Sequence, residues 1–165
     1  MIHPQLHLDR QLCFSAYTLS RLITQSYQPL LKALDLTYPQ YLVMLVLWQA
    51  EEEGRLPVAV KYLCGQLLLD TGTLTPLLKR MEAAGLLLRA RAEHDERVVL
   101  VQLTEAGLLL REQAAAVPQE ILCRTGVTQT EAESLRNRLQ KLIRRWAGRC
   151  SDQPTGSGLP GSDPE

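Results

Sequence analysis

Apolar residues along most of this chain recur every three or four positions, the spacing that places them on one face of a helix. This pattern predicts helices at about 10–34, 38–50, 58–68, 73–84, 105–124 and 129–148. The runs 86–91 and 98–104 are short and aliphatic, and the second is strongly β-branched, so we predict two antiparallel strands there. The expected fold class is therefore mainly α with a small β-hairpin.

The stretch 67–107 joins a polar helix directly to this hairpin. Asp70 is suited to cap the start of the helix, and Gly85 to end it. The apolar face of the helix is formed by Leu74, Leu77, Leu78 and Met81. Residues 92–97 form a charged tip that we expect to be too long for a two-residue turn. Two short helices followed by such a hairpin are the order of elements in a winged helix-turn-helix.

Cap and breaker residues set the expected ends of the other helices. Asp9 is a plausible cap for the first helix and Thr37 for the second, and Thr128 with Glu131 forms a capping-box pattern before the last. Pro118 should kink or break the helix at 105–124. From Cys150 onward the composition changes to Ser, Asp, Gly and Pro, so we expect one domain at 1–149 and a disordered tail at 150–165.

The composition mainly argues against certain classes of protein and site. The 165 residues carry 18 basic and 18 acidic side chains, so any binding to nucleic acid must come from local clusters of charge. Four cysteines are scattered without a CxxC pair or histidine-rich spacing, so we expect no metal and no cofactor. The N-terminus does not resemble a signal peptide, and no apolar run approaches membrane-spanning length. These features predict a cytoplasmic protein with reduced thiols.

Cys13 is the first candidate for chemistry. It falls in the first turn of its helix, where unpaired backbone N–H groups favour an anionic sulfur, although a single cysteine among apolar residues is more often a small core residue. Tyr17 and Tyr27 lie within about 40° of Cys13 around the helix, but Tyr27 is about 21 Å further along its axis. Tyr27 can therefore act at a Cys13 sulfur only from a partner subunit packed antiparallel, and Tyr38 could arrive with it.

Two groups of motifs resemble a known family. The string LLLDTGTLTPLLKRMEAAGLLLRAR, followed by DERVVLVQLTEAG, resembles the recognition helix and wing of the MarR-type winged-helix transcriptional regulators. LCFxxY, YxPLL and LTYPQY resemble the signature of the branch that senses organic hydroperoxides, called OhrR. The resemblance spans about 8–146, and Thr71 departs from it where that branch commonly has serine.

The resemblance implies a homodimeric repressor on a pseudo-palindromic double-stranded DNA operator. Dimerisation helices are expected at about 9–35 and 105–148, and a DNA-binding module at about 56–104. Cys13 would be the peroxide-reactive thiol, which organic hydroperoxide oxidises. Tyr27 and Tyr38 would hydrogen-bond its sulfur across the interface, and Tyr17 would have a lesser, orienting role. Cys123 is the preferred resolving thiol, as in the two-cysteine subclass, with Cys150 and Cys64 as alternatives.

The DNA contacts are expected on the recognition helix and the wing. Short and basic side chains face outward early on the helix, and basic ones on the hairpin; the candidates are Thr71, Thr73, Thr75, Pro76, Lys79, Arg80, Arg91, His94, Asp95 and Arg97. Asp95 is more suited to orient an arginine than to contact DNA. Arg97 is either a minor-groove reader or half of an ion pair, and the sequence leaves both open.

Other functions are compatible with parts of the pattern. A repressor of the same family could be released by a small phenolic or other anionic ligand, with Cys13 merely structural. A thiol peroxidase is disfavoured because no acid-base cluster or paired redox motif accompanies Cys13, and no catalytic residue is expected. A non-catalytic interaction module, or a monomer whose terminal helices pack on its own body, is a blander alternative.

Overall fold

The computed structural model describes residues 3–151, with side chains for 3–147. The last helix extends through Ser151, two residues into the predicted tail, and the rest of that tail lies outside the described residues. The chain divides into two units, 1–124 and 125–165, which are described separately. The first unit contains short 3₁₀ helices at Pro4–Leu6 and Leu8–Arg10, then α1 (Leu12–Lys32), α2 (Tyr38–Glu52), β1 (Val58–Ala59), α3 (Val60–Leu67), α4 (Thr71–Ala83), β2 (Leu87–Ala92), β3 (Asp95–Leu103), α5 (Glu105–Ala114) and α6 (Val117–Thr125). The second contains α7 (Gln129–Ser151).

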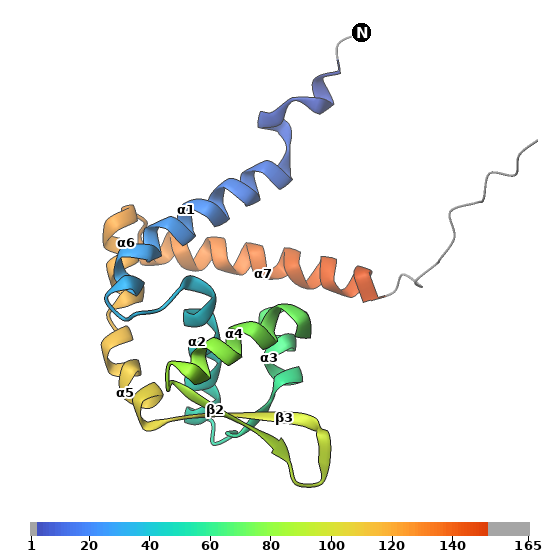
Figure 1. Cartoon of the computed structure of the whole chain (residues 1–165). Coiled ribbons are helices and arrows are strands. Elements are labelled where there is room, and N and C mark those ends of the chain that lie inside the picture. The colour runs from blue at the N-terminus through green and yellow to red at the C-terminus, as the bar shows by residue number, and fades with distance from the viewer. Residues whose placement is uncertain (1–2, 152–165) are drawn as a thin grey trace, which may run out of the picture. The chain divides into compact units, whose positions relative to one another are not determined.

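The fold class expected from the sequence is confirmed, since helices dominate and the strands form one small antiparallel sheet (Figure 1). The sheet has three strands in the order β1-β3-β2, however, and not two. Residues 58–59 were predicted as helix but form β1, in which Val58 pairs with Val101. A two-residue strand has no periodicity of its own, so its partner decides its conformation.

The tip of the hairpin was also predicted wrongly. The ladder between β2 and β3 continues as far as Ala92, which pairs with Asp95, and a register shift lies between Arg91 and Ala92. Only Glu93 and His94 remain in the turn. The charged residues therefore lie mostly in strands, because a solvent-exposed hairpin accepts charged side chains without losing its backbone hydrogen bonds.

The start of α1 differs from the expectation as well. Asp9 does not cap it, because Leu8–Arg10 forms a separate 3₁₀ helix and the chain is extended at Gln11, with φ −89° and ψ 116°. The N-cap residue is Gln11, which provides no side-chain cap. Cys13 is nonetheless the second residue of α1 and so lies in its first turn, as predicted.

Most other helix ends follow the predicted signals. Thr37 caps α2 in a reciprocal capping box with Gln40, and Asp70 caps α4 by accepting the Thr73 amide at 2.8 Å. Gly85 follows α4 with φ +73°, a conformation that favours glycine. Helices α5 and α6 are separated at 115–116, and Pro118 occupies the first turn of α6. These signals are local, which is why the sequence alone predicts them.

The core of the first unit surrounds α2. Met44 and Leu47 are fully buried on α2, and the predicted apolar face of α4 is buried against the same core: Leu74, Leu77, Leu78 and Met81. Val101 from β3 and Leu63 from α3 complete it. Helix α4 is therefore held by its inner side, while its outer side is exposed.

In the second unit, Thr128 and Glu131 form the predicted capping box. The Thr128 amide donates to Glu131 Oε2 at 2.9 Å, and the Glu131 amide donates to Thr128 Oγ1 at 3.3 Å. Large apolar side chains at three- and four-residue spacing along α7 remain exposed: Leu135, Leu139, Ile143 and Trp146. An exposed apolar stripe on a long helix is typical of a surface that another chain covers.

A joint around Gly107 connects the hairpin, α5 and α2. The Trp48 indole Nε1 donates to the Gly107 carbonyl at 2.8 Å. Thr104 Oγ1 donates to the Gly85 carbonyl at 2.6 Å and accepts the Gly107 amide at 3.0 Å. The backbone at Gly107 approaches Leu86 so closely that a Cβ at this position would overlap the Leu86 carbonyl oxygen. Only glycine fits here.

We therefore expect Gly107→Ala to lower the free energy of unfolding by about 1–3 kcal/mol, because either the new methyl group or the Leu86 backbone must move. Urea unfolding measures the change. The matched control is Gly65→Ala on α3, where a Cβ meets nothing within 4 Å and helix propensity should raise stability by about 0.5–1 kcal/mol. A Gly107→Ala protein as stable as wild type would contradict the close contact.

Candidate functional site

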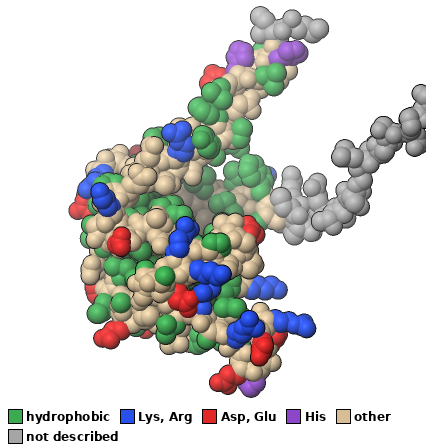
Figure 2. All heavy atoms as spheres, in the orientation of Figure 1, with side chains coloured by type: hydrophobic (Ala, Val, Ile, Leu, Met, Phe, Trp, Pro, Cys, Tyr) green, Lys and Arg blue, Asp and Glu red, His purple; other side chains and the backbone are tan. Residues whose placement is uncertain are grey.

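The outward side of α4 combines short polar and basic side chains. Thr71, Thr73, Pro76, Lys79 and Arg80 are exposed, and Figure 2 shows Lys and Arg side chains gathered where α4 and the hairpin lie. The sixth predicted contact on this helix, Thr75, is half-buried.

The threonines at the start of α4 differ in how free their hydroxyl groups are. Asp70 accepts both the amide and, at 2.7 Å, the hydroxyl of Thr73, and these hydrogen bonds lower the pKa of Asp70. The hydroxyl hydrogen of Thr73 is therefore used in the bond to Asp70, and the hydroxyl oxygen remains available mainly as an acceptor. Thr71 Oγ1 lies 3.7 Å from Cys64 Sγ on α3, which ties the turn between the two helices together.

An ion pair that sequence reasoning missed fixes the end of α4 to the wing. Glu82 Oε2 accepts from Arg89 Nη2 at 2.6 Å and from Nε at 3.0 Å, and Oε1 accepts the Arg89 backbone amide at 2.9 Å. These hydrogen bonds lower the pKa of Glu82. A helix residue and a strand residue seven positions apart share no periodic signal, so only the fold reveals the pair.

The wing leaves one arginine unpaired. Asp95 Oδ1 accepts the backbone amide of Arg97 at 2.9 Å, and the Arg97 guanidinium makes no ion pair within residues 3–147. Asp95 thus orients Arg97 through its backbone. Arg91 lies 3.6 Å from Glu96, with both side chains largely exposed, and His94 is exposed in the turn. Of the two roles left open for Arg97, the intrachain ion pair is not formed.

The predicted redox residues occupy two separate places on α1. Cys13 and Tyr17 are exposed near its start, where the Arg21 guanidinium lies 5.7 Å from the Tyr17 ring centroid. Tyr27, towards its end, contacts Tyr38 of α2 with ring centroids 5.2 Å apart. Within one chain the structure therefore brings Tyr27 and Tyr38 together, while fourteen helical residues, about 21 Å of rise, separate them from Cys13.

A third tyrosine belongs to this cluster. Tyr41 is one helical turn after Tyr38 and lies 5.8 Å from the Tyr27 ring and 6.4 Å from the Trp48 ring. Burial raises the pKa of Tyr27 and of Tyr38, and it raises the pKa of Tyr41 to about 12. All three hydroxyl groups are protonated at neutral pH and can donate hydrogen bonds. The sequence analysis did not single out Tyr41, although its three-residue spacing from Tyr38 places both on one face of α2.

The remaining cysteines lie on other elements. Cys123 is exposed on α6, with Gln119 Nε2 at 4.0 Å from its sulfur, and Cys64 is half-buried on α3. Neither is bonded to Cys13 in this structure. The side chain of Cys150 lies outside the described residues.

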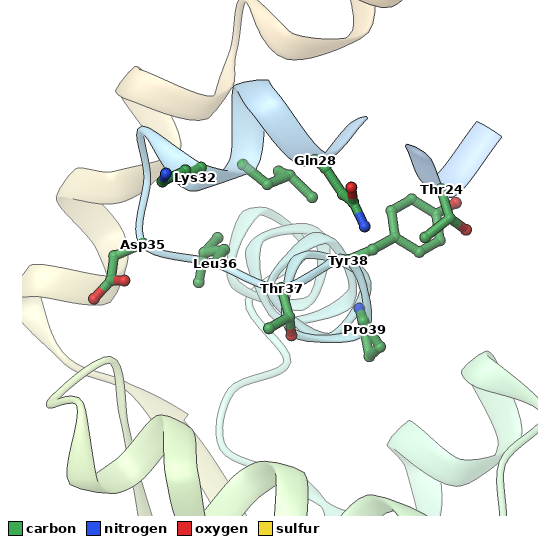
Figure 3. Close-up of a pocket in the computed structure, with 9 residues that line it drawn as sticks. Thr24, Gln28, Lys32, Asp35, Leu36, Thr37, Tyr38 and Pro39 are labelled. Carbon is green, nitrogen blue, oxygen red and sulfur yellow. The ribbon is translucent and has the colours of Figure 1, made fainter. Parts of the chain in front are cut away.

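A cavity of about 510 Å³ lies beside Tyr38, between the second half of α1 and the start of α2 (Figure 3). Its wall combines apolar, hydroxyl, amide and charged groups: Thr24, Gln28, Leu31, Lys32, Asp35, Leu36, Thr37, Tyr38 and Pro39. In Figure 3, Tyr38 extends beside Thr24 at one end, and Lys32 and Asp35 lie at the other. Tyr38 is thus shared between the cavity and the tyrosine cluster.

Two further features bear on the class of protein. Across residues 3–147, His, Cys, Asp and Glu side chains do not gather in a group of three that could hold a metal ion. No helix in the described part of the chain combines the length and apolar character needed to cross a bilayer.

Comparison with known proteins decides the family. Residues 25–112 match the family model of the SarA/Rot transcriptional regulators. The chain is 49% identical over 131 residues to the organic hydroperoxide resistance transcriptional regulator of Bacillus subtilis, which covers 79% of this chain and 84% of that protein. The reduced form of MarR from E. coli shares 25% identity at a TM-score of 0.61, with coverage of 81% and 96%. The chain belongs to the MarR/SarA family of winged-helix transcriptional regulators.

This MarR/SarA-family regulator is also similar to AbfR, solved from Staphylococcus epidermidis. The structure of reduced AbfR bound to DNA has 35% identity and a TM-score of 0.67, covering 87% of this chain and 96% of AbfR. A disulfide-formed AbfR structure matches with 38% identity and a TM-score of 0.56, covering 84% and 94%. The family predicted from the sequence motifs is thereby confirmed, and this protein is a DNA-binding regulator.

The pair of Glu82 and Arg89 generates a pH-dependent prediction. Because the pKa of Glu82 is lower in the folded state than its ordinary value of 4.5, the pair stabilises the fold above that pH, and the contribution is lost as the pH falls through the lowered pKa. Glu82→Gln should therefore lower the urea midpoint more at pH 7 than at pH 3, because the contribution of the pair declines as the pH falls below 4.5. Glu96→Gln, on the exposed wing, is the control and should change neither midpoint. An equal loss at both pH values would remove the charge from the explanation.

Proposed function

We propose that this regulator is a cytoplasmic homodimer that represses transcription from a pseudo-palindromic double-stranded operator. It releases the operator when an organic hydroperoxide oxidises Cys13. The observation that carries the proposal is the placement of an exposed Cys13 at one end of α1 and the Tyr27–Tyr38 pair at the other. The name of the Bacillus subtilis relative, an organic hydroperoxide resistance regulator, and the reduced and disulfide-formed states of AbfR support it.

An antiparallel pair of α1 helices unites the two halves of the site. If Cys13 of one protomer lies opposite Tyr27 of the other, the residue numbers of any two facing positions add up to 40. Ser20 then faces the partner's Ser20. The two-fold symmetry of a dimer then forms the same site twice. The exposed apolar stripe of α7 supports a dimer independently, because a second chain would remove it from water.

The chemistry at Cys13 is a two-electron transfer. The thiolate attacks the outer peroxide oxygen, the O–O bond breaks, and the alkoxide leaves and takes up a proton to become the alcohol. The sulfur is oxidised to a sulfenic acid, and the thiol of Cys123 can condense with it to form a disulfide and water. Cys150, then Cys64, are the alternatives. The protonated Tyr27 and Tyr38 hydroxyl groups are suited to hydrogen-bond the sulfur or the leaving oxygen.

We infer that this reaction is a signal and not turnover. Regeneration of the thiol needs an external reductant, and the described residues show no paired redox motif or acid-base cluster around Cys13. Tyr17, exposed beside Cys13 on the same face, is assigned an orienting role at the sulfur. The protein is therefore proposed to be a regulator without catalytic residues.

The tyrosine cluster provides a physical route to the DNA-reading module. Tyr27 contacts Tyr41, Tyr41 contacts Trp48, and Trp48 donates to the Gly107 carbonyl in the joint. In the same joint, the Thr104 hydroxyl donates to the carbonyl of Gly85, which lies in the turn after the recognition helix α4. A displacement of the tyrosines on oxidation would thus reach both the recognition helix and the wing, and it would change the spacing between the two α4 helices of the dimer.

On the operator, α4 would enter the major groove and the wing would follow the adjacent minor groove. Thr71, Thr75 and Pro76 would approach base edges and phosphates, with the Thr73 hydroxyl as an acceptor. Lys79 and Arg80 would contact phosphates. On the wing, Arg97 is proposed to enter the minor groove, Arg91 and His94 to contact the backbone, and Asp95 to orient Arg97.

A second candidate function is favoured by the cavity beside Tyr38. Its volume of about 510 Å³ and the ammonium of Lys32 suit a small phenolic or other anionic ligand, whose binding would release the operator without any reaction at Cys13. The two candidates differ in whether release depends on the cysteine.

That difference sets the test. Electrophoretic mobility of a DNA fragment from upstream of the protein's own gene is measured with and without cumene hydroperoxide. Wild type should bind when reduced and lose at least about tenfold in affinity when oxidised. Cys13→Ser should bind in both conditions, because serine cannot form the sulfenic acid. If cumene hydroperoxide also releases the Cys13→Ser protein from DNA, Cys13 is not the sensing residue. A Cys123→Ser control shows whether a disulfide is needed.

A further inference from the structure

Exposed leucines lie in the two short helices before α1 and at its first residue. Leu6, Leu8 and Leu12 expose 74%, 60% and 57% of their surface, and in Figure 1 the two short helices extend from α1 away from α2. A run of leucines held in water costs stability unless another surface covers them. We call residues 4–12 the strap.

The antiparallel register identifies that surface, and this step rests on the proposed function. With Cys13 opposite Tyr27, the partner's Leu12 faces Gln28, and the partner's residues before the extended Gln11 continue beyond Gln28 towards Lys32. Lys32 lies five residues beyond Tyr27, about 7.5 Å along the helix, and the strap covers a similar length before Cys13. The extended backbone at Gln11 lets the strap bend relative to α1. The strap of one protomer therefore runs along the cavity of the other.

The cavity matches the strap in chemistry. Leu31, Leu36 and the Tyr38 ring provide apolar surface for leucine side chains, and the charged pair Lys32 and Asp35 lies at the end away from Tyr38 (Figure 3). The strap carries the opposite charges in adjacent positions, Asp9 and Arg10. None of these four charged groups forms an ion pair within residues 3–147. Two unpaired charges of each sign therefore meet across the proposed contact.

We propose that the strap of each protomer packs into the cavity of its partner. The partner's Leu8 lies against Leu31 and Leu36, the partner's Asp9 pairs with Lys32, and the partner's Arg10 pairs with Asp35. The strap covers the side of Tyr38 that faces the cavity, so it holds the tyrosine that meets the reactive sulfur. The strap also lies directly before Cys13 of its own protomer, so its docking limits access to that sulfur.

Disulfide trapping tests the register directly. All four native cysteines are replaced by serine, and Leu8→Cys is combined with Lys32→Cys in the full chain. Mild oxidation with diamide should give a covalent dimer on a non-reducing gel. Residues 8 and 32 lie at or beyond opposite ends of α1, which is about 30 Å long, so they cannot bond within one chain. The control combines Leu8→Cys with Lys61→Cys, an exposed position on α3 outside the proposed contact, and should stay monomeric on the gel.

No cross-link between positions 8 and 32 in a protein that still elutes as a dimer, or equal cross-linking of the control, would overturn the proposal. Because Cys13 is absent from these variants, the result does not depend on peroxide chemistry. Failure of the strap and failure of the sensing function are thus separately visible: the first leaves peroxide-dependent release by wild type intact.

A charge reversal tests the same contact with the native cysteines present. The single variants Asp9→Lys and Lys32→Asp should each speed the reaction of Cys13 with a bulky maleimide by about tenfold, and the double variant should restore the wild-type rate. A rate that responds to Lys32→Asp but not to Asp9→Lys would contradict the strap and assign the cavity to a small anionic ligand instead.

Discussion

The close approach of Gly107 to Leu86 is the constraint on which the working parts of this regulator depend. It lets the start of α5 lie against the turn that ends α4, where Thr104 holds the Gly85 carbonyl and Trp48 donates to the Gly107 carbonyl. The recognition helix, the wing, α5 and α2 therefore meet within one small set of hydrogen bonds. Helix α2 carries Tyr38 in its first turn and Trp48 further on, so one rigid element links the tyrosine cluster to the DNA-reading module.

The acidic residues beside the proposed DNA contacts have structural partners. Asp70 is occupied by Thr73 as a helix cap, Glu82 braces Arg89, and Asp95 accepts the Arg97 amide. Only Glu82 is neutralised by an ion pair, whereas Asp70 and Asp95 are held by neutral donors and keep their charge. Lys79, Arg80 and Arg97 make no ion pair among the described residues. A protein of zero formal charge can in this way present a locally basic surface.

The sequence predicts the features whose causes are local. Thr37, Asp70 and Gly85 act within one helical turn, and the apolar face of α4 follows from its own periodicity. The features it misses have distant causes: β1 exists because β3 offers a partner, and the hairpin tip closes on Glu93 and His94 because the ladder continues.

The same distinction applies to the site. The angle between Cys13 and Tyr27 and the rise between them follow from the sequence, as does the conclusion that Tyr27 can reach a Cys13 sulfur only from a second chain. The pairing of Glu82 with Arg89, and the contacts of Tyr41 with Tyr27 and Trp48, require the fold, since no spacing in the sequence relates those side chains across elements.

The central claim is that oxidation at the α1 interface changes the spacing of the two recognition helices. The most direct test measures that spacing in the free dimer by pulsed electron paramagnetic resonance. Exposed Ala83, at the end of α4, is replaced by a keto-bearing residue, and a spin label is attached to it in each protomer. Reduced protein should give a narrow distance distribution compatible with successive major grooves, about 34–36 Å apart. Cumene hydroperoxide should shift it in wild type but not in Cys13→Ser. An unchanged distribution in wild type whose Cys13 is fully oxidised would contradict the account.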